Sequence, residues 1–473
     1  MSNLERGAIH FVGIGGVGMS AIAEIVARRA GVRVTGSDRV ASATTQRLAD
    51  LGVRVTIGHT AAVVAGAELV VLSSAIPADN PERLEAERRG IPVISRARML
   101  ASLMKGQRSI AISGSHGKST TTWMVATLAI EAELDPTVVV GGRLAGLGGG
   151  ARCGDGDLVV VEADESDGSF LELDPLGAIV TNVDREHLSH FGSFEALREA
   201  FVSFAAALPA NGLLVVPHDD GLTARLRHAA RCPVVTFGFA AGTGEPAAAA
   251  ADVTARRLSH SPAETLFDLI VRGETVVRVA LPVPGIHNVR NALAAAATAH
   301  WLGIPAARIA SGLARFVPVG RRLELLGEAA GITVVDDYAH HPREIDATLD
   351  GARQAYADRR LVVLFQPHRY TRTRELAEEF PRALAGASLC FVTDIYAAGE
   401  SPVAGVSAEW LVEAARRAGN EHVCYVPSNH IVRIVGSQLE PGDVLLCLGA
   451  GNVNQSGRDV LAMLARGVAA EAH

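Results

Sequence analysis

Lysine and net positive charge are scarce in this sequence of 473 residues. Only two of the 44 basic residues are lysines, Lys105 and Lys118, and 51 acidic residues give a formal net charge of −7. This balance argues against a protein that binds nucleic acid or a membrane surface, because both need a positive field. It still allows a local anion-binding site, and it makes each lysine conspicuous.

Paired cysteines and long apolar runs are also missing. The five cysteines are far apart, with no CxxC pair, which predicts reduced thiols in a cytoplasmic protein. No run of about 18 uncharged apolar residues occurs. The first residues, MSNLERGAIHFVG, lack the apolar segment of a signal peptide. We therefore expect a cytoplasmic protein without a membrane span.

What the sequence does contain is a regular alternation of short apolar runs and helical patterns. Hydrophobic residues make up 48% of the chain and charged residues 20%, as in ordinary globular proteins. The alternation predicts βαβ units and parallel sheets. Representative strands are expected at Ile9–Val12, Ile110–Ser113, Ala178–Thr181, Leu361–Phe365 and Val444–Leu448.

A glycine-rich turn follows the predicted strand Ser109–Ser113 and precedes the predicted helix Thr121–Ile130. In such a turn, backbone N–H groups at the helix start bind phosphate, a lysine faces the β- and γ-phosphates, and a hydroxyl reaches Mg²⁺. The first glycine is one position later than in GxxxxGK[ST], and an ordinary glycine turn is the alternative. The predicted phosphate loop is Gly114, Ser115, His116, Gly117, Lys118, Ser119 and Thr120.

Carboxylates follow the next buried strand. Leu158–Val161 leads into Glu162 and an acidic block that ends at Asp167. Because ligands of open parallel sheets bind at the carboxyl ends of strands, Glu162 is a candidate metal ligand, with a solvated acidic turn as the alternative. His187, a little beyond the strand Ala178–Thr181, is a second candidate through its neutral imidazole.

The first strand leads into a second glycine motif, G-x-G-x-x-G, which ends at Gly18. Asp38 follows Gly18 by 20 residues, at the end of the next predicted strand. This arrangement predicts a diphosphate on a helix N-terminus and a carboxylate near sugar hydroxyls. NAD and a nucleoside-diphosphate sugar both satisfy it, and a purely structural turn is the third alternative.

These patterns together predict an α/β protein of three domains. We expect a Rossmann-like domain over residues 1–106 and a second Rossmann-like domain over 320–473. Between them, residues 107–319 are expected to form a P-loop ATPase-like parallel sheet. A small antiparallel portion is expected at Thr265–Val271 and Thr275–Leu281.

Ten sequence blocks, in order along the whole chain, resemble those of the Mur ligase family. They are HFVGIGGVGMS, GSHGKSTTT, VEADESDGSF, TNVDREHL, GIHNVRNALAA, GRRLELLG, DDYAHHPREI, FQPHRYTRTRE, DIYAAGE and LGAGN. The resemblance implies an ATP-dependent ligase of peptidoglycan precursor synthesis. It would join L-alanine to the lactyl carboxylate of UDP-N-acetylmuramate through an acyl phosphate. The implied cofactors are ATP and Mg²⁺, with Mn²⁺ as a substitute, and the implied form is a monomer or homodimer.

The resemblance also assigns residues. The UDP-sugar would contact Gly15, Gly16, Val17, Gly18, Ser37, Asp38 and Ser73. ATP would contact the phosphate loop together with His287, Asn291, Asp337 and Tyr338. Magnesium would be held by Ser119, Glu162 and His187. Alanine and the transferring phosphate would meet His340, His368, Arg369 and Arg372. The residues expected to carry the chemistry are Lys118, Glu162, His187, His368, Arg369 and Arg372, and either His340 or His368 would accept the amine proton.

The chain departs from the family in places. The loop reads GSHGKST rather than GTHGKTT, which keeps the hydroxyls. Related ligases carry a carbamylated lysine further on, but Ser193–Leu208 contains no lysine, and Arg198 cannot be modified in that way.

Three other functions stay open. A recycling ligase would add a tripeptide to the same sugar nucleotide. An NAD-dependent oxidoreductase would use the first glycine motif but leave GSHGKST unexplained. A regulatory module would bind ATP without releasing phosphate.

Overall fold

The structure is a computed structural model that describes residues 7–29, 31–73, 75–142, 149–186, 188–239, 251–318 and 320–471. The chain forms two compact units. The first contains two sheets, and the second contains the third sheet together with residues 258–266 and 281–289. Each unit is described by itself.

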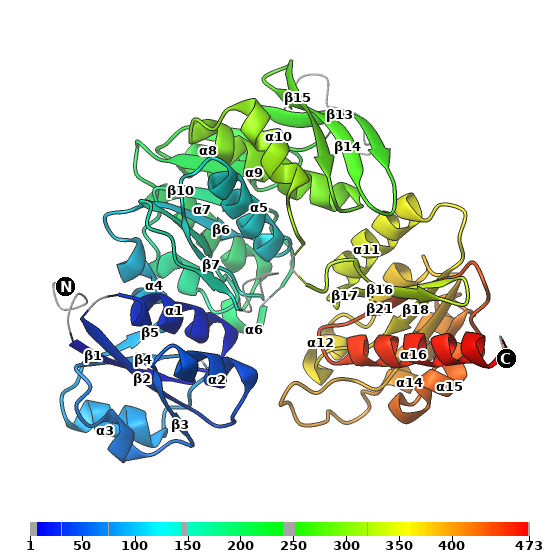
Figure 1. The fold of residues 1–473 in the computed structure, drawn as a ribbon, viewed down its shortest axis with the longest axis horizontal. Coiled ribbons are helices and arrows are strands. Elements are labelled where there is room, and N and C mark those ends of the chain that lie inside the picture. Colours follow the sequence, from blue (N-terminus) through cyan, green and yellow to red (C-terminus); the bar gives the residue numbers. More distant parts are fainter. Residues whose placement is uncertain are drawn as a thin grey trace. The chain divides into compact units, whose positions relative to one another are not determined.

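The first sheet is parallel and has the order β3-β2-β1-β4-β5 (Figure 1). Strand β1 is buried from Ala8 to Val12, as expected for a strand with both faces covered. The strand order reverses beside β1, which places a crevice at its carboxyl end. The elements are β1 (Gly7–Val12), α1 (Val17–Ala27), β2 (Val32–Asp38), α2 (Ala43–Asp50), β3 (Arg54–Ile57), β4 (Leu69–Leu72), α3 (Pro81–Arg88), β5 (Val93–Ser95) and α4 (Arg96–Met104).

The second sheet has the order β15-β14-β13-β12-β11-β10-β6-β9-β7-β8. Its centre is parallel, and β8 is antiparallel to β7. Strands β14 and β15 are joined by Arg272 and Gly273, a turn short enough for a hairpin. The strands are β6 (Arg108–Ser113), β7 (Thr137–Val139), β8 (Ala151–Arg152), β9 (Leu158–Glu162), β10 (Gly177–Val180), β11 (Leu213–Pro217), β12 (Val234–Phe237), β13 (Val253–His260), β14 (Thr265–Val271) and β15 (Glu274–Leu281).

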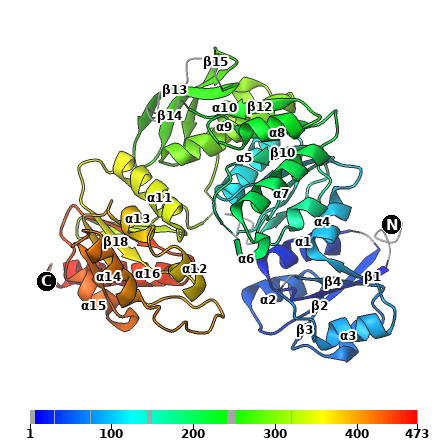
Figure 2. The ribbon, with the colours of Figure 1, turned by 180° about the vertical axis from the view of Figure 1, so that it is seen from behind.

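Helices pack around this second sheet (Figure 2). They are α5 (Lys118–Glu131), α6 (Leu188–Phe191), α7 (Phe194–Ala207), α8 (Thr223–Ala229), α9 (Ile286–Trp301) and α10 (Ala306–Ala314). Helix α5 begins at Lys118 rather than at the predicted Thr121, so Ser119 and Thr120 lie in its first turn. The sequence pattern missed this start because the residue before the helix is Gly117, which has no capping side chain, and because the first turn carries no apolar residue.

The third sheet has the order β16-β17-β21-β18-β19-β20, and only its edge strand β16 is antiparallel among these six strands. The strands are β16 (Glu324–Ala329), β17 (Ile332–Asp337), β18 (Leu361–Phe365), β19 (Leu389–Val392), β20 (Val423–Tyr425) and β21 (Val444–Leu448). The helices are α11 (Pro342–Ala355), α12 (Tyr370–Glu375), α13 (Phe380–Leu384), α14 (Ala408–Arg417), α15 (Ile431–Gly436) and α16 (Val453–Glu471).

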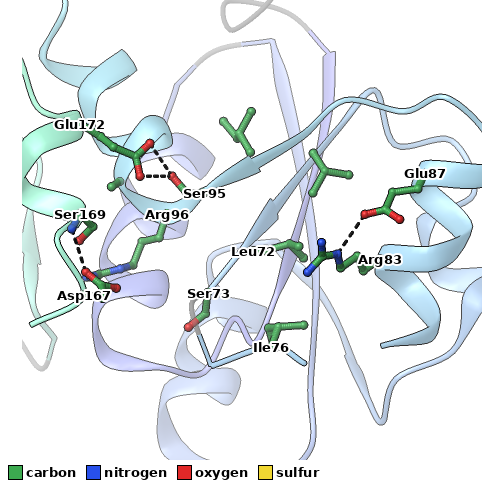
Figure 3. A pocket seen from close by; sticks show the side chains of 13 residues that line it. Leu72, Ser73, Ile76, Arg83, Glu87, Ser95, Arg96, Asp167, Ser169 and Glu172 are labelled. Carbon is green, nitrogen blue, oxygen red and sulfur yellow. Dashed lines mark hydrogen bonds and ion pairs between the residues drawn. The ribbon is translucent and has the colours of Figure 1, made fainter. Parts of the chain in front are cut away.

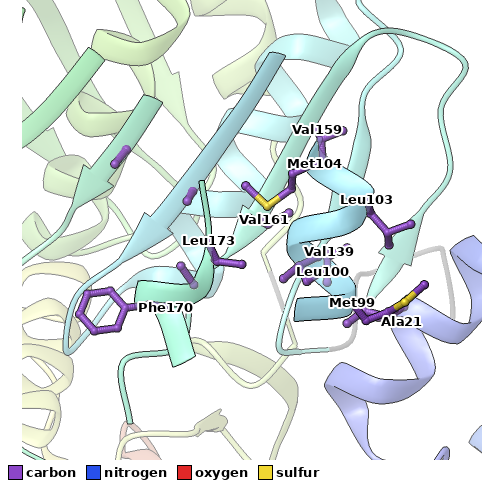
Figure 4. Packing of buried hydrophobic residues seen from close by; sticks show 14 of the residues in the cluster. Ala21, Met99, Leu100, Leu103, Met104, Val139, Val159, Val161, Phe170 and Leu173 are labelled. Carbon is purple, nitrogen blue, oxygen red and sulfur yellow. The ribbon is translucent and has the colours of Figure 1, made fainter. Parts of the chain in front are cut away.

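One buried cluster joins the first two sheets. Leu100, Leu103 and Met104 of α4 pack with Val159 and Val161 of β9 (Figure 4). Helix α4 therefore connects the core of the first sheet with the strand that ends in Glu162. Among the described residues, no helix is long and apolar enough to cross a membrane.

Candidate functional site

The glycine turn after β6 forms a tight loop at the start of α5. Gly114 has φ +128° and Gly117 has φ +78°, backbone conformations that glycine adopts without strain. A Cβ on Gly114 would lie 2.8 Å from the carbonyl oxygen of Asn182, and one on Gly117 would lie 3.3 Å from Cγ of Asn291. At both positions, the close neighbours and the φ angle each exclude a side chain.

The end of β10 holds this loop in place. The Asn182 side chain accepts a hydrogen bond from the His116 N–H at 2.9 Å and donates to the His116 carbonyl at 3.0 Å. The Thr181 hydroxyl donates to the same carbonyl at 2.6 Å. The Ser115 hydroxyl accepts from the Asp184 N–H at 2.8 Å. The loop is thus shaped before any phosphate binds.

Lys118 points back into the loop. Its ammonium group donates to the carbonyls of Gly114 at 2.6 Å and Ser115 at 3.0 Å, and it pairs with Glu165 at 2.9 Å. Burial alone would lower the pKa of Lys118, but the charges of Glu165 and Glu162 raise it above its usual value. Lys118 is therefore charged, and its ammonium group lies inside the glycine turn at the start of α5.

Glu162 and Ser119 lie together beside this lysine. Glu162 accepts from the Gly141 N–H at 2.7 Å and from the Ser119 hydroxyl. Burial raises the pKa of Glu162, and neighbours such as Lys118 offset only part of this effect. A carboxylate beside a hydroxyl supplies the kind of oxygen donors that Mg²⁺ prefers. The predicted third ligand, His187, lies outside the described residues.

The glycine turn of the first sheet lies at the carboxyl end of β1, as predicted. The Gly15 N–H donates to Asp38 Oδ2 at 2.8 Å. Val17 is 49% exposed at the start of α1. The guanidinium of Arg96 lies against Gly18. A Cβ built on Gly18 would lie 2.5 Å from Arg96 Nη1. Arg96 also pairs with Asp164 at 3.7 Å, so it links this turn to the acidic block after β9.

Ser73 lines a pocket of about 470 Å³ in the same unit. Figure 3 shows Ser73 and Arg96 facing this pocket from the first domain. Asp167 and Ser169, from the segment after β9, also line it, and Glu172 accepts a hydrogen bond from Ser95 at 3.1 Å. Residues of the first sheet's domain and residues of the segment after β9 therefore line the same pocket.

The Ser37 side chain makes its hydrogen bonds in the protein interior rather than at the surface. It is fully buried, and its hydroxyl donates to Glu82 Oε2 at 2.7 Å. His10 contacts Glu82 at 3.0 Å and His59 contacts it at 3.0 Å. We call Ser37, Glu82, His10 and His59 the Glu82 cluster. In this conformation it supports the end of β2 next to Asp38.

Asp337 and Tyr338 follow β17 in the second unit. Asp337 accepts the N–H groups of Leu323 and Ala339, each at 2.8 Å. Burial raises the pKa of Asp337 to about 6. Tyr338 is 37% exposed, and the guanidinium carbon of Arg322 lies 5.4 Å from the centre of its ring.

The four residues predicted around alanine come close together in this unit. The rings of His340 and His368 have centres 5.5 Å apart, and Arg372 Nη1 lies 3.3 Å from His368 Nδ1. Arg369, next in sequence, has φ +70°. Burial lowers the pKa of each histidine to about 4, so both rings are neutral near neutral pH.

The two residues predicted at adenine lie on α9 but belong to different units. Asn291 contacts the phosphate loop at Gly117. His287 is half-buried beside Gly285 and Gly351, and the loss of solvent around its ring lowers its pKa to about 4.

Comparison with known proteins gives the family. Residues 8–108 match "Mur ligase family, catalytic domain", residues 112–299 match "Mur ligase middle domain", and residues 321–451 match "Mur ligase, glutamate ligase domain". The chain belongs to the Mur ligase family. The predicted resemblance is confirmed over almost the whole chain.

Individual Mur ligases are similar over their full length. A "UDP-N-acetylmuramate--L-alanine ligase" of Sorangium cellulosum is 48% identical over 465 residues, covering 96% of each chain. One of Geobacter sp. (strain M21) is 48% identical over 98% of each chain. The crystal structure of a UDP-N-acetylmuramate-alanine ligase from Thermotoga maritima has a TM-score of 0.80 at 30% identity, covering 98% of this chain and all of that one. The predicted three-domain α/β fold is confirmed.

Sequence reasoning missed several residues that shape this Mur ligase site. Glu165 pairs with Lys118, Thr181 and Asn182 brace the loop, and Arg96 contacts the first glycine turn. Glu165, Thr181 and Asn182 lie at or just beyond the ends of predicted parallel strands. Their positions alone could therefore have indicated that they belong to the site. Arg96 had no such signal, since only the packing of α4 brings it to Gly18.

Proposed function

We propose that this Mur ligase joins L-alanine to the lactyl carboxylate of UDP-N-acetylmuramate at the expense of ATP. The observation that carries the proposal is the 48% identity, over nearly the full chain, to ligases named for that reaction. The braced loop, with Lys118 and the Glu162–Ser119 pair, supports it. We also propose the division into domains 1–106, 107–319 and 320–473, and a cytoplasmic monomer or homodimer.

In the first proposed step, the lactyl carboxylate attacks the γ-phosphorus of ATP, and ADP leaves. Lys118 exchanges its contacts with Glu165 and the loop carbonyls for the terminal phosphates. Ser119, Glu162 and His187 would hold Mg²⁺ or Mn²⁺, which offsets phosphate charge when bound. The protein contributes mainly position and charge.

In the second step, the neutral amine of alanine attacks the acyl phosphate and inorganic phosphate leaves. Arg369 and Arg372 carry planar guanidinium groups that bind a carboxylate or phosphate with two hydrogen bonds. His340, His368, Arg369 and Arg372 are accordingly proposed to surround alanine and the departing phosphate.

The sugar nucleotide is proposed to lie on the first glycine turn, Gly15 to Gly18, with Asp38 near the uridine. Ser73 and the pocket beside it would receive the sugar, from which the lactyl group extends toward Glu162. Ser37 is proposed to act through the backbone it supports. His287, Asn291, Asp337 and Tyr338 are proposed to contact the nucleotide. We propose that domain closure then joins the substrates, with joints at residues 105–108 and 318–322.

A phosphate-release assay with each substrate omitted in turn tests the proposal. Release should require ATP, UDP-N-acetylmuramate and L-alanine together. Glycine, serine and a tripeptide, tested in place of alanine, separate this function from that of a recycling ligase. Release with the tripeptide but not with alanine contradicts the proposal, and turnover of NAD would indicate an oxidoreductase.

A further inference from the structure

His340 and His368 differ in the atoms that their ring nitrogens face. His340 Nδ1 lies 3.0 Å from the carbonyl oxygen of Tyr338 and 3.3 Å from Oε2 of Glu344. Both oxygens can only accept, so Nδ1 of His340 carries the proton and donates it. The lone pair of the neutral ring is therefore on Nε2, which has no hydrogen-bond partner among the residues that the structure describes.

His368 has the opposite arrangement. Its Nδ1 lies 3.3 Å from Nη1 of Arg372, and a guanidinium can only donate. Nδ1 of His368 is therefore the acceptor, and its Nε2 carries the proton. In this geometry, the neutral ring of His368 offers a ligand an N–H donor and no free lone pair.

The charges around the two rings also distinguish His340 from His368. Glu344 favours a positive charge on His340, whereas Arg322 and Arg372 oppose it. His340, Arg372 and Arg369 all disfavour a positive charge on His368, and Glu400 favours one with a smaller effect. A carboxylate behind an imidazole orients it and stabilises the imidazolium that forms during proton transfer.

Tyr396 holds His368 in its orientation. The two rings stack with centres 5.6 Å apart and an angle of 10° between their planes. The Tyr396 N–H donates to the Pro367 carbonyl at 2.8 Å, and the Tyr396 carbonyl accepts from the Arg369 N–H at 2.8 Å. These contacts hold the His368 ring in the orientation in which its Nδ1 faces Arg372.

We propose that His340 Nε2 accepts the proton of the attacking amine, whereas His368 keeps its proton and donates a hydrogen bond from Nε2 to the substrate. This inference rests on the proposed function. The amine nitrogen forms a bond to the carbonyl carbon of the acyl phosphate, and one N–H proton passes to His340. The C–O bond to phosphate breaks, and its electron pair leaves with inorganic phosphate. His340 then returns its proton to water.

Hydroxylamine separates the two steps of the reaction. It is neutral near neutral pH and reacts with acyl phosphates without a protein base, so hydroxamate formation from ATP and UDP-N-acetylmuramate reports the first step alone. The matched variants are His340→Gln and His368→Gln, compared with the wild type in this assay and in alanine ligation.

For His340→Gln we expect kcat for alanine ligation to fall by about 10²- to 10⁴-fold, while hydroxamate forms near the wild-type rate. His368→Gln keeps an N–H donor, so its KM for alanine should rise more than its kcat falls. Glu344→Gln should lower kcat for alanine by a smaller factor than His340→Gln and keep hydroxamate formation.

The inference is overturned if His368→Gln, and not His340→Gln, loses alanine ligation while keeping hydroxamate formation. Equal loss of both steps in His340→Gln also overturns it, because His340 would then act before the amine arrives. A wild-type enzyme that forms no hydroxamate contradicts the proposed function instead.

Discussion

At the scale of single residues, the site depends on side chains whose charges are balanced by near neighbours. Lys118 is held by Glu165 and two loop carbonyls, and the Glu82 cluster places one carboxylate between two histidines. Removing one partner from such a group leaves the others buried without compensation. Two substitutions therefore have clear expected effects.

Lys118→Met should lower ATP-dependent phosphate release by at least about 100-fold, because one preorganised donor to the transferring phosphate is lost. The chain offers a matched control in Lys105, its only other lysine, which is exposed at the end of α4. Lys105→Met changes an exposed side chain and not the backbone of the proposed joint at residues 105–108, so it should release phosphate at the wild-type rate. Equal activity of the two variants would contradict the assignment of the loop.

Glu82→Gln should destabilise the protein by about 1–3 kcal/mol in urea unfolding, since His10 and His59 lose a charged acceptor. Burial would raise the pKa of Glu82, but hydrogen bonds from His10, Ser37 and His59 lower it below its usual value of 4.5. A lowered pKa stabilises the fold above about pH 4.5, and this stabilisation is lost as the pH falls.

The difference between Glu82→Gln and the wild type should accordingly shrink below that pH. The control is Glu85→Gln on the same helix, where a half-buried carboxylate pairs with the exposed guanidinium groups of Arg88 and Arg89 and little stability should change. A destabilisation of Glu82→Gln that persists unchanged in acid would contradict this account.

At the scale of elements, the site is built where parallel strands end. The end of β6 gives the phosphate loop, β9 gives Glu162, and β10 gives the residues that brace the loop. The glycines between strand and helix are the least replaceable positions, because both their φ angles and their neighbours exclude a side chain.

Gly117→Ala should raise the KM for ATP and leave the fold intact. Gly303→Ala is the matched control, because Gly303 has φ +79°, close to the +78° of Gly117, but no neighbouring atom among the described residues within 4 Å of the place that a Cβ would take. In both variants alanine must adopt a left-handed backbone conformation, which costs about 1–2 kcal/mol of stability. Only Gly117→Ala also displaces Asn291. Equal KM values for ATP would show that backbone strain alone matters.

The elements around the loops were predictable because buried parallel strands have a strong apolar signature. Strands β14, β18 and β21 have the predicted bounds, and most others differ by one or two residues. The sequence did not predict β8, β12, β13 or β16, which are short or lie toward the edges of their sheets. Their pairing depends on neighbouring strands rather than on a local pattern.

Side-chain partners were less predictable than positions. The family resemblance places His340 and His368 near the same substrate, but only three-dimensional contacts show which nitrogen of each ring is protonated. The Glu82 cluster joins residues separated by up to 72 positions, so no local pattern could reveal it.

At the scale of the whole molecule, the described chain has two compact units with separate cores. The cluster that contains Leu103 spans the first two sheets, whereas Leu411 belongs to a cluster of the third sheet. The first two sheets should therefore unfold together, and the third sheet should unfold on its own.

Calorimetry of two variants tests this division. Leu103→Ala and Leu411→Ala each remove a buried leucine, at a cost of about 2–5 kcal/mol. Each should lower the Tm of a different transition and leave the other in place. A single transition that both variants shift equally would show that the units unfold as one.

The central claim is that the γ-phosphate of ATP passes to the sugar-borne carboxylate before alanine reacts. Mass spectrometry of released phosphate tests it most directly, with UDP-N-acetylmuramate whose lactyl carboxylate carries heavy oxygen. The account predicts that each phosphate released during alanine ligation contains one oxygen from that carboxylate. Phosphate released without the label, at the full rate of ligation, would contradict it.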